Sequence, residues 1–252
     1  MFLPTDLCSS CSHDYILIHT ESKTWSEAQA YCREKYTDLA IINNNLDMNR
    51  VVDKMENVYN DFWIGLYEGV VTWRWSLSDK SYYASLGAEF RNWGVGEPND
   101  ESGIQQCAAI QHTGDWKVLG CDVLNYFLCF DDRTGAPEGT ILVETAMKWV
   151  DAQGYCRKHH TDLVSVRKEG ENQKIQSMIP EGKQAWIGLF QDSWTWSDGS
   201  YSSFRYWSQT RDSTGEGPKC AHVYDRTWSV RSCKTTSMFL CSCKQNCLLI
   251  FF

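Results

Sequence analysis

The sequence lacks the features that define several large functional classes. Its 24 lysines and arginines are outnumbered by 32 aspartates and glutamates, for a net charge of −8, whereas a nucleic-acid partner requires a basic face. No glycine-rich phosphate loop occurs, and none of the six histidines has a metal-ligand spacing or a nucleophile motif beside it. We therefore expect neither enzymatic activity nor a nucleic-acid partner.

Long apolar runs are also missing. No stretch reaches the ~18–20 residues that a membrane helix needs, and the apolar tail at residues 248–252 is short. Residues 1–12 have no basic region and no apolar run of the kind that a secretory leader contains, since Asp6 interrupts them. We interpret residues 1–12 as a leader remnant or a disordered N-terminus, and we expect no membrane segment in this chain.

Cysteine, by contrast, is abundant. The 12 cysteines stand at positions 8, 11, 32, 107, 121, 129, 156, 220, 233, 241, 243 and 247. Zinc sites need two closely spaced pairs, and only the first two cysteines form a good one. The density indicates a disulfide framework made in an oxidising compartment. We expect a secreted or extracellular protein, with a truncated membrane receptor as an open alternative.

The chain also repeats itself. Residues 23–33 (KTWSEAQAYCR) align with residues 147–157 (MKWVDAQGYCR), and the Trp-Ile-Gly-Leu segment at 63–66 recurs at 186–189. Paired tryptophans and a Phe-Leu-Cys segment follow in the same order in both halves. Ordered self-similarity of this kind indicates a duplicated module. We predict domain 1 at residues 13–131, a linker at 132–136, domain 2 at 137–242 and a tail at 243–252; the two domains are called copy one and copy two below.

Local patterns predict helices and strands in both copies. Thr24 and Glu27 have the spacing of a capping box, and Trp25, Ala28 and Cys32 share one face of the helix that follows. A second helix is predicted over 46–55. Copy two shows a strand at 141–143, a helix ending near residue 158 and a second helix over 171–178. Trp25, Trp63, Trp149 and Trp186 are predicted to lie in the cores.

Taken together, the Trp-x2-Ala-x3-Cys helix, the Trp-Ile-Gly-Leu segment, the paired tryptophans and four ordered cysteines per copy resemble the C-type lectin-like domain. The resemblance covers residues 13–131 and 137–242, and it is greatest to multi-domain lectins of the macrophage mannose receptor type. It implies an α+β double-loop fold in each copy, with two helices, small antiparallel sheets and disulfide staples.

The cysteine order alone leaves three pairings open in each copy. The resemblance implies the nested one: Cys32–Cys129 with Cys107–Cys121, and Cys156–Cys241 with Cys220–Cys233. The remaining four are Cys8, Cys11, Cys243 and Cys247. They could pair locally or join two chains in a disulfide-linked dimer.

The resemblance also implies a candidate sugar site. Such lectins hold a sugar through Ca²⁺, with oxygens from a Glu-Pro-Asn loop containing a cis proline, a second glutamate and a Trp-Asn-Asp motif. Copy one keeps Glu97-Pro98-Asn99, and Asp100 follows it. However, Gln105 replaces the second glutamate, and Lys117 and Val118 replace the Asn and Asp.

Copy two has no Glu-Pro-Asn loop, and Ser229-Val230 follow its final tryptophan. We therefore expect a degenerate site, with weak calcium binding at Glu97 and Asn99 at most and no certain cofactor. Three hypotheses remain. The chain binds a glycan or an extracellular protein without a robust calcium site, or it is a calcium-dependent mannose-type lectin through copy one, or it is a sugar-independent protein-interaction scaffold.

Overall fold

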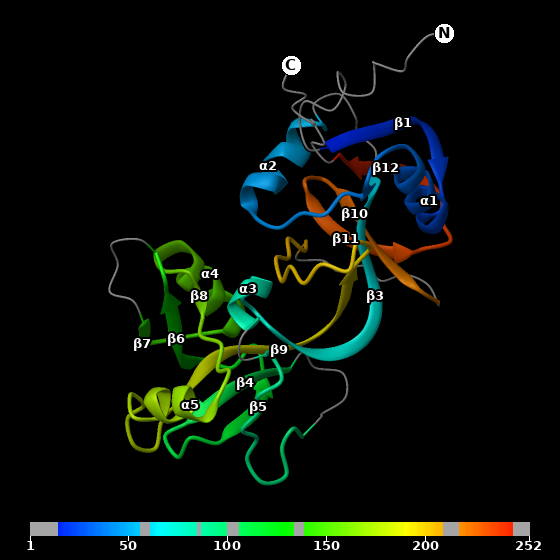
Figure 1. Ribbon diagram of the computed structural model, residues 1–252. Coiled ribbons are helices and arrows are strands. Elements are labelled where there is room, and N and C mark those ends of the chain that lie inside the picture. The colour runs from blue at the N-terminus through cyan, green and yellow to red at the C-terminus, as the bar shows by residue number, and fades with distance from the viewer. Residues whose placement is uncertain are drawn as a thin grey trace, which may run out of the picture. The chain divides into compact units, whose positions relative to one another are not determined.

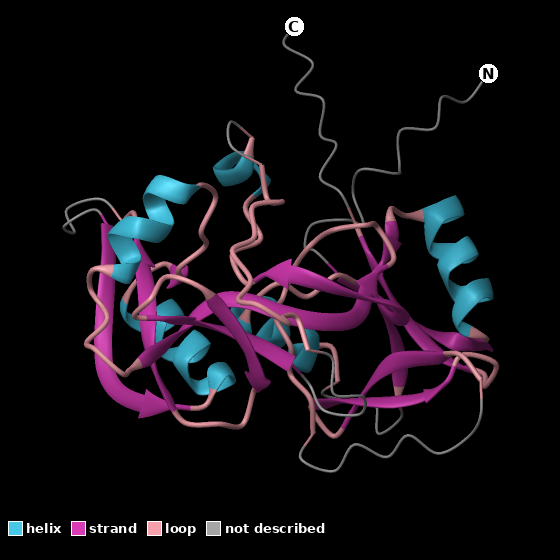
Figure 2. Ribbon diagram, turned by 90° about the horizontal axis from the view of Figure 1, so that it is seen from below, coloured by secondary structure: helices cyan, strands magenta, loops and turns pink. Residues whose placement is uncertain are grey.

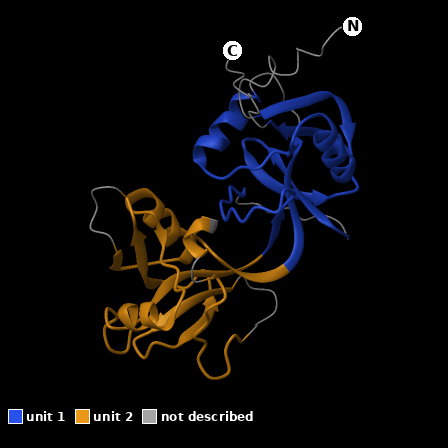
Figure 3. Cartoon of the chain, in the orientation of Figure 1, with its two compact units in different colours: residues 1–70, 193–252 blue, residues 71–192 orange. Residues whose placement is uncertain are grey.

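A computed structural model describes residues 15–55, 61–84, 87–99, 106–133, 139–208 and 217–243 (Figure 1). These residues form two compact units, and each unit is a mixed α+β structure (Figures 2 and 3). Unit 1 combines residues 1–70 with 193–252, and unit 2 spans residues 71–192. No helix in the described part of the chain is long and apolar enough to cross a membrane.

The described residues of unit 1 form two helices and several strands. Its elements are β1 (Tyr15–Lys23), α1 (Trp25–Lys35), β2 (Asp38–Leu39), α2 (Asn45–Asp53), most of β3 (Phe62–Trp75), the end of β9 (Gln184–Trp196), β10 (Lys219–Tyr224), β11 (Thr227–Ser232) and β12 (Ser237–Ser242).

Unit 2 has the same kind of content. Its elements are the end of β3, α3 (Lys80–Tyr83), β4 (Gln106–Gln111), β5 (Trp116–Gly120), β6 (Asn125–Asp131), β7 (Gly139–Met147), α4 (Trp149–His159), β8 (Asp162–Leu163), α5 (Glu169–Gln176) and most of β9.

The helices form where the sequence predicts them. The Glu27 carboxylate accepts hydrogen bonds from the backbone N–H of Thr24, at 2.9 Å, and from its hydroxyl, at 2.6 Å, so the capping box at the start of α1 is present. Trp25, Ala28 and Cys32 are the buried residues of this helix. The predicted one-sided apolar face is therefore confirmed.

Tryptophans occupy equivalent core positions in the two units. Trp25, Trp63, Trp149 and Trp186 are all buried, as predicted. The indole N–H of Trp25 donates to the carbonyl of Ile64 in β3 at 2.8 Å. The indole N–H of Trp149 donates to the carbonyl of Ile187 in β9, also at 2.8 Å. A buried indole needs such an acceptor, and the Trp-Ile-Gly-Leu strand supplies it in both units.

The compact units differ from the predicted domains at 13–131 and 137–242. We call the part of each copy up to and including most of the Trp-Ile-Gly-Leu strand its front half, and the remainder its back half. Unit 1 joins the front half of copy one to the back half of copy two, and unit 2 joins the other two halves. Strands β3 and β9 each run from one unit into the other. The copies have exchanged halves (Figure 3).

The disulfides follow this exchange. The inner bonds, Cys107–Cys121 and Cys220–Cys233, are as predicted. The nested outer pairs Cys32–Cys129 and Cys156–Cys241 are wrong for this structure, because Cys32 is bonded to Cys241 and Cys129 to Cys156. All eight cysteines are therefore paired, and both outer bonds connect one copy to the other.

Three of the four remaining cysteines, Cys8, Cys11 and Cys247, lie outside the described residues. Cys243 is disulfide-bonded.

The short connection between the copies is one factor that favours the exchange. Strands β6 and β7 form an antiparallel hairpin in register from Phe127–Val143 to Asp131–Gly139. Strands β1 and β12 pair in the equivalent way in unit 1, with Ile16 opposite Cys241. A strand pair closed by a few residues loses less chain entropy than one closed across a whole copy. The short connection therefore favours pairing of β6 with β7 over pairing of β6 with β1.

A polar cluster reinforces the hairpin. The buried carboxylate of Asp131 accepts a hydrogen bond from Arg133 Nη2 at 2.7 Å and lies 2.8 Å from His160 Nδ1. The hydrogen bonds from Arg133 and then from His160 hold the pKa of Asp131 well below its usual range. These contacts join the end of β6 to the C-terminal end of α4.

Candidate functional site

The loop that carries Glu97 lies against strand β5 in unit 2. The N–H of Gly94 donates to the carbonyl of Trp116 at 2.8 Å, and the N–H of Trp116 donates to the carbonyl of Asn92 at 2.7 Å. A β-carbon on Gly94 would lie 2.8 Å from Asp115 Oδ2. The absence of a side chain at Gly94 thus lets the loop approach β5 closely.

The Glu97 carboxylate points back at the backbone. Its Oε2 atom accepts hydrogen bonds from the N–H of Asn99 at 2.9 Å and from the N–H of Val118 at 3.2 Å. The Glu97–Pro98 peptide bond is cis, as the family resemblance implies. Glu97 and Asn99 are therefore brought to one loop beside β5, with one carboxylate oxygen of Glu97 already accepting from two amides.

Lys117 and Val118, which replace the Asn-Asp pair, lie on opposite faces of β5. Trp116 and Val118 are buried, while Lys117 between them is exposed. The cation of Lys117 thus lies on the solvent side of β5, and the apolar side chain of Val118 packs inward.

Asp115, a nearby carboxylate, is held by its own turn. Its Oδ2 atom accepts a hydrogen bond from Gln111 Nε2 at 2.7 Å, and its Oδ1 accepts from the hydroxyl of Thr113. Nowhere in the described part of the chain do three His, Cys, Asp or Glu side chains come together as a metal site would require. A calcium ion needs about 6–8 oxygens, and the described residues of this loop supply fewer. Asp100 and Gln105, also predicted at the site, lie outside the described residues.

The corresponding region of copy two lies in unit 1. The N–H of Trp228 donates to the carbonyl of Tyr206 at 2.8 Å. This bond is equivalent to the one from Trp116 to Asn92 at the start of β5. Val230 is buried like Val118. Asp225 and Arg226 form the turn between β10 and β11, with positive φ angles of 45° and 60°. The loop at 209–216 lies outside the described residues.

The remaining tryptophans pack in clusters around these loops. Trp73 and Trp93 are half-buried, with ring centroids 4.9 Å apart, and Trp93 meets the edge of Trp116 at 5.7 Å. Trp194 and Trp207 form the equivalent pair at 4.7 Å. All four pack against another indole, so we assign them to the support of the loops.

Sequence reasoning missed one residue that supports the candidate site. Asn172 of α5 is 1% exposed. Its Oδ1 accepts a hydrogen bond from Trp116 Nε1 at 2.8 Å, and its Nδ2 donates to the carbonyl of Gly114 at 2.8 Å. It fixes both β5 and the turn before it. The sequence offers one signal for this residue: a polar asparagine stands where the equivalent position of copy one has the apolar Met48.

Comparison with known proteins identifies the family of both copies. A family model described as "Lectin C-type domain" matches residues 21–130 and 145–243.

The chain belongs to the C-type lectin domain family.

Individual relatives are more distant. C-type mannose receptor 2 of Homo sapiens is 26% identical over 215 residues, which are 73% of this chain and 14% of the receptor. L-selectin of Bos taurus is 32% identical over 111 residues, which are 42% of this chain and 29% of the selectin. Among solved structures, human lithostathine aligns over 97% of this chain and 96% of its own, at 12% identity and a TM-score of 0.39. The chain thus spans less than a third of these mannose receptor and selectin chains.

In this C-type lectin the candidate site is a product of both copies. Glu97, Asn99 and Val118 come from copy one, whereas the helices α4 and α5 of the same unit come from copy two. The loop that would meet a ligand and the helix residue Asn172 that stabilises its neighbouring strand therefore belong to different copies.

Proposed function

We propose that this C-type lectin is an extracellular recognition protein that binds a glycan or a protein ligand without depending on calcium. The observation that carries the proposal is the Glu97 carboxylate, whose Oε2 accepts from two backbone amides beside the buried Val118. Those two amides compete with an ion for that oxygen, and Val118 stands where the resemblance implies a carboxylate ligand. The disulfide framework agrees with an extracellular setting, and the family favours binding over catalysis.

Calorimetric titration of Ca²⁺ into the folded chain, with and without mannose, tests this proposal. We expect no binding heat and no rise in melting temperature at millimolar Ca²⁺. Calcium-dependent mannose binding by the natural chain would refute the proposal and leave the mannose-type lectin as the function.

A restoration variant sharpens the test. Gln105→Glu, Lys117→Asn and Val118→Asp together return the missing oxygen ligands to copy one, so this variant should gain a calcium response. The matched control is Ser229→Asn with Val230→Asp in copy two, which restores the same motif where no Glu-Pro-Asn loop exists. The control should gain nothing.

A glycan array probed in EDTA then separates the two ligand classes. Binding to any glycan supports a calcium-independent lectin. A silent array with a folded protein favours the protein-interaction scaffold, in which case non-reducing electrophoresis shows whether a disulfide-linked dimer is the active form.

A further inference from the structure

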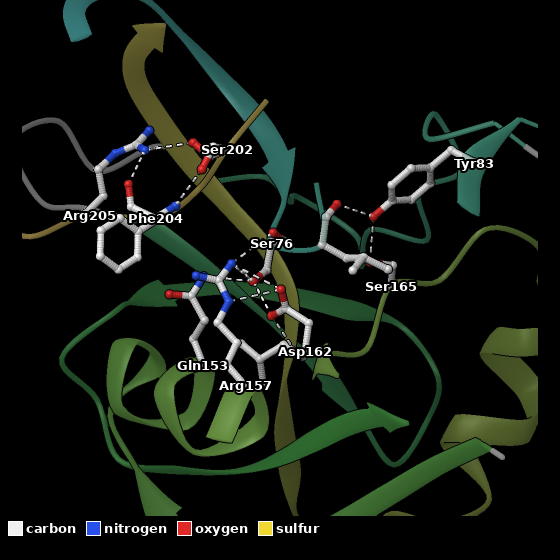
Figure 4. Close-up of polar contacts among 11 residues, drawn as sticks. Ser76, Tyr83, Gln153, Arg157, Asp162, Ser165, Ser202, Phe204 and Arg205 are labelled. Carbon is white, nitrogen blue, oxygen red and sulfur yellow. Dashed lines mark hydrogen bonds and ion pairs between the residues drawn. The ribbon is translucent and has the colours of Figure 1, made fainter. Parts of the chain in front are cut away.

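Each front half of this protein could in principle pack with either back half, and some contacts suit both choices equally. In unit 2, Ser76 Oγ donates to Asp162 Oδ1 at 2.5 Å and Arg157 Nε donates to Asp162 Oδ2 at 3.1 Å (Figure 4). In unit 1, Ser197 Oγ and Arg33 Nε donate to the equivalent aspartate at 2.8 and 3.0 Å. The same residue types recur in both units, so this network stabilises the fold without selecting a partner.

Other contacts suit only the exchanged pairing. Asn172 in the front half of copy two binds Trp116 and Gly114 in the back half of copy one. Its counterpart in copy one is Met48, whose sulfur accepts from Trp228 Nε1 at 3.3 Å. Within a single copy, α5 would instead face the two-residue turn of Asp225 and Arg226, which has no glycine. A β-carbon at Gly114 would lie 2.5 Å from Gln176 Oε1 of α5, so the exchanged pairing gives this helix the turn that leaves room for it.

The segment around α3 gives a second such match. It occurs only in copy one, because copy two is shorter between its paired tryptophans and the Phe-Arg segment that follows. Tyr83 Oη lies 2.8 Å from Ser165 Oγ (Figure 4), and Arg167 stacks on the Tyr82 ring at 3.9 Å while donating to its carbonyl at 2.8 Å. The residues of copy one equivalent to Ser165 and Arg167 are Ile41 and Asn43. The tyrosine hydroxyl also donates to the carbonyl of Leu77 in its own copy at 2.9 Å. Copy two therefore adds a second hydroxyl partner and the cation that stacks on α3, and copy one has neither at the equivalent positions.

Charge gives a third match, in unit 1. The half-buried Asp61 in the front half of copy one forms an ion pair with Arg231 and lies 3.8 Å from His222 Nε2, and both partners belong to copy two. At the equivalent positions of copy one stand Leu119 and Ala109. An unexchanged copy one would leave the half-buried carboxylate of Asp61 without a cation, which is unfavourable because a buried charge needs a partner.

The other side of this match is equally specific. Gln184 stands in copy two where copy one has Asp61, and its Nε2 donates to Asn125 Oδ1 at 2.9 Å in unit 2. In the unexchanged pairing the counterpart of Asn125 would be Ser237, whose hydroxyl instead donates to the carbonyl of Asp61 at 2.7 Å. The neutral amide faces an amide, and the carboxylate faces the guanidinium of Arg231.

We propose that these copy-specific pairs encode the exchange, so that the front half of each copy is the recognition partner of the back half of the other copy. The folded module is then always a hybrid, and neither copy is a self-sufficient domain. This inference does not depend on the proposed function.

The test uses the full chain and reads the outer disulfides directly. The reduced protein is refolded in a glutathione buffer, and mass spectrometry of its proteolytic peptides measures the ratio of Cys32–Cys241 to Cys32–Cys129. We expect the exchanged bond to exceed the nested one by at least tenfold in the natural chain. A predominance of Cys32–Cys129 would overturn the proposal.

Transposing the copy-specific residues should move this ratio. The variant carries Met48→Asn, Asn172→Met, Asp61→Gln and Gln184→Asp, which gives each front half the residues suited to its own copy. We expect the ratio to fall at least tenfold relative to the natural chain, and an unchanged ratio would refute the role of these pairs. The matched control is Arg33→Lys with Arg157→Lys, which weakens both units alike and should lower stability without changing the ratio.

A second variant keeps the test decisive if the transposed chain fails to fold. About ten Gly and Ser residues inserted between residues 134 and 138 lower the entropic advantage of the β6–β7 hairpin and leave every copy-specific pair intact. We expect Cys32–Cys241 to remain the main outer bond. A switch to Cys32–Cys129 would show that linker length alone selects the exchange, and would overturn the proposal.

Discussion

Replacing Asn172 probes the contact on which both the candidate site and the exchange depend. In Asn172→Leu, a side chain of similar size with no polar atoms takes its place. The indole N–H of Trp116 then loses its acceptor in a fully buried position. The carbonyl of Gly114 loses one donor but keeps Asn92 Nδ2 at 2.9 Å.

The magnitude follows from these two losses. An unsatisfied buried donor costs about 1–3 kcal/mol, and a lost hydrogen bond whose acceptor keeps another partner costs about 1 kcal/mol. We therefore expect Asn172→Leu to lower the free energy of unfolding by about 2–4 kcal/mol. Asn172→Met should cost only about 1–2 kcal/mol, because a thioether accepts from an indole in the equivalent position at Met48.

Urea unfolding with the disulfides intact, followed by tryptophan fluorescence, measures both losses. Hydrogen exchange at the amides of β5 shows whether the change lies in unit 2, where we expect it. If the Leu and Met variants lose equal stability, or if both stay within about 0.5 kcal/mol of the natural chain, the hydrogen bonds from Asn172 do not stabilise the unit as described.

Three further predictions concern single residues. Burial, and then the nearby guanidinium of Arg231, lowers the pKa of His222 from 6.5 to about 4, so the folded state keeps this imidazole neutral. The neutral imidazole therefore stabilises the fold fully above pH 6.5, and this stability is lost as the pH falls toward 4, by at most roughly 3 kcal/mol. His222→Ala should flatten the pH dependence of urea unfolding in that window. Gly114→Ala should destabilise more than Gly96→Ala, because both glycines have positive φ but only the new β-carbon at 114 meets a neighbour, Gln176 at 2.5 Å; equal melting temperatures would contradict this. The pKa of Asp131 is lowered, so its ionised form stabilises the fold above about pH 4 and that stability is lost as the pH falls further; Asp131→Asn should remove this acid sensitivity, as thermal unfolding between pH 2 and 5 would show.

Much of the fold follows from local pattern. The capping box at Thr24, the buried face of α1 and the core tryptophans depend on residues close in sequence, which is why they are predicted correctly. The outer disulfides depend on which half packs on which. Cys32 and Cys156 occupy equivalent positions before equivalent strands, so their surroundings look alike in either pairing.

The candidate site divides in the same way. The position of Glu97 and Asn99 follows from a family motif, and the structure places both in one loop. Asn172 could not be inferred, because a single asparagine on a short polar helix is usually a solvated residue. Its role becomes visible only when the turn at Gly114, 58 residues away in sequence, is brought against α5.

The exchange also makes unit 2 a circularly permuted lectin domain, encoded by one uninterrupted stretch from residue 71 to 192. During synthesis it can be completed as soon as β9 has emerged, and Cys129 needs to wait only 27 residues for Cys156. Cys32 must wait 209 residues for Cys241, which is about 10–40 s at ordinary rates of translation. The middle of the chain can thus fold and oxidise first, while Cys32 in the first helix remains a free thiol until the last strand has been synthesised.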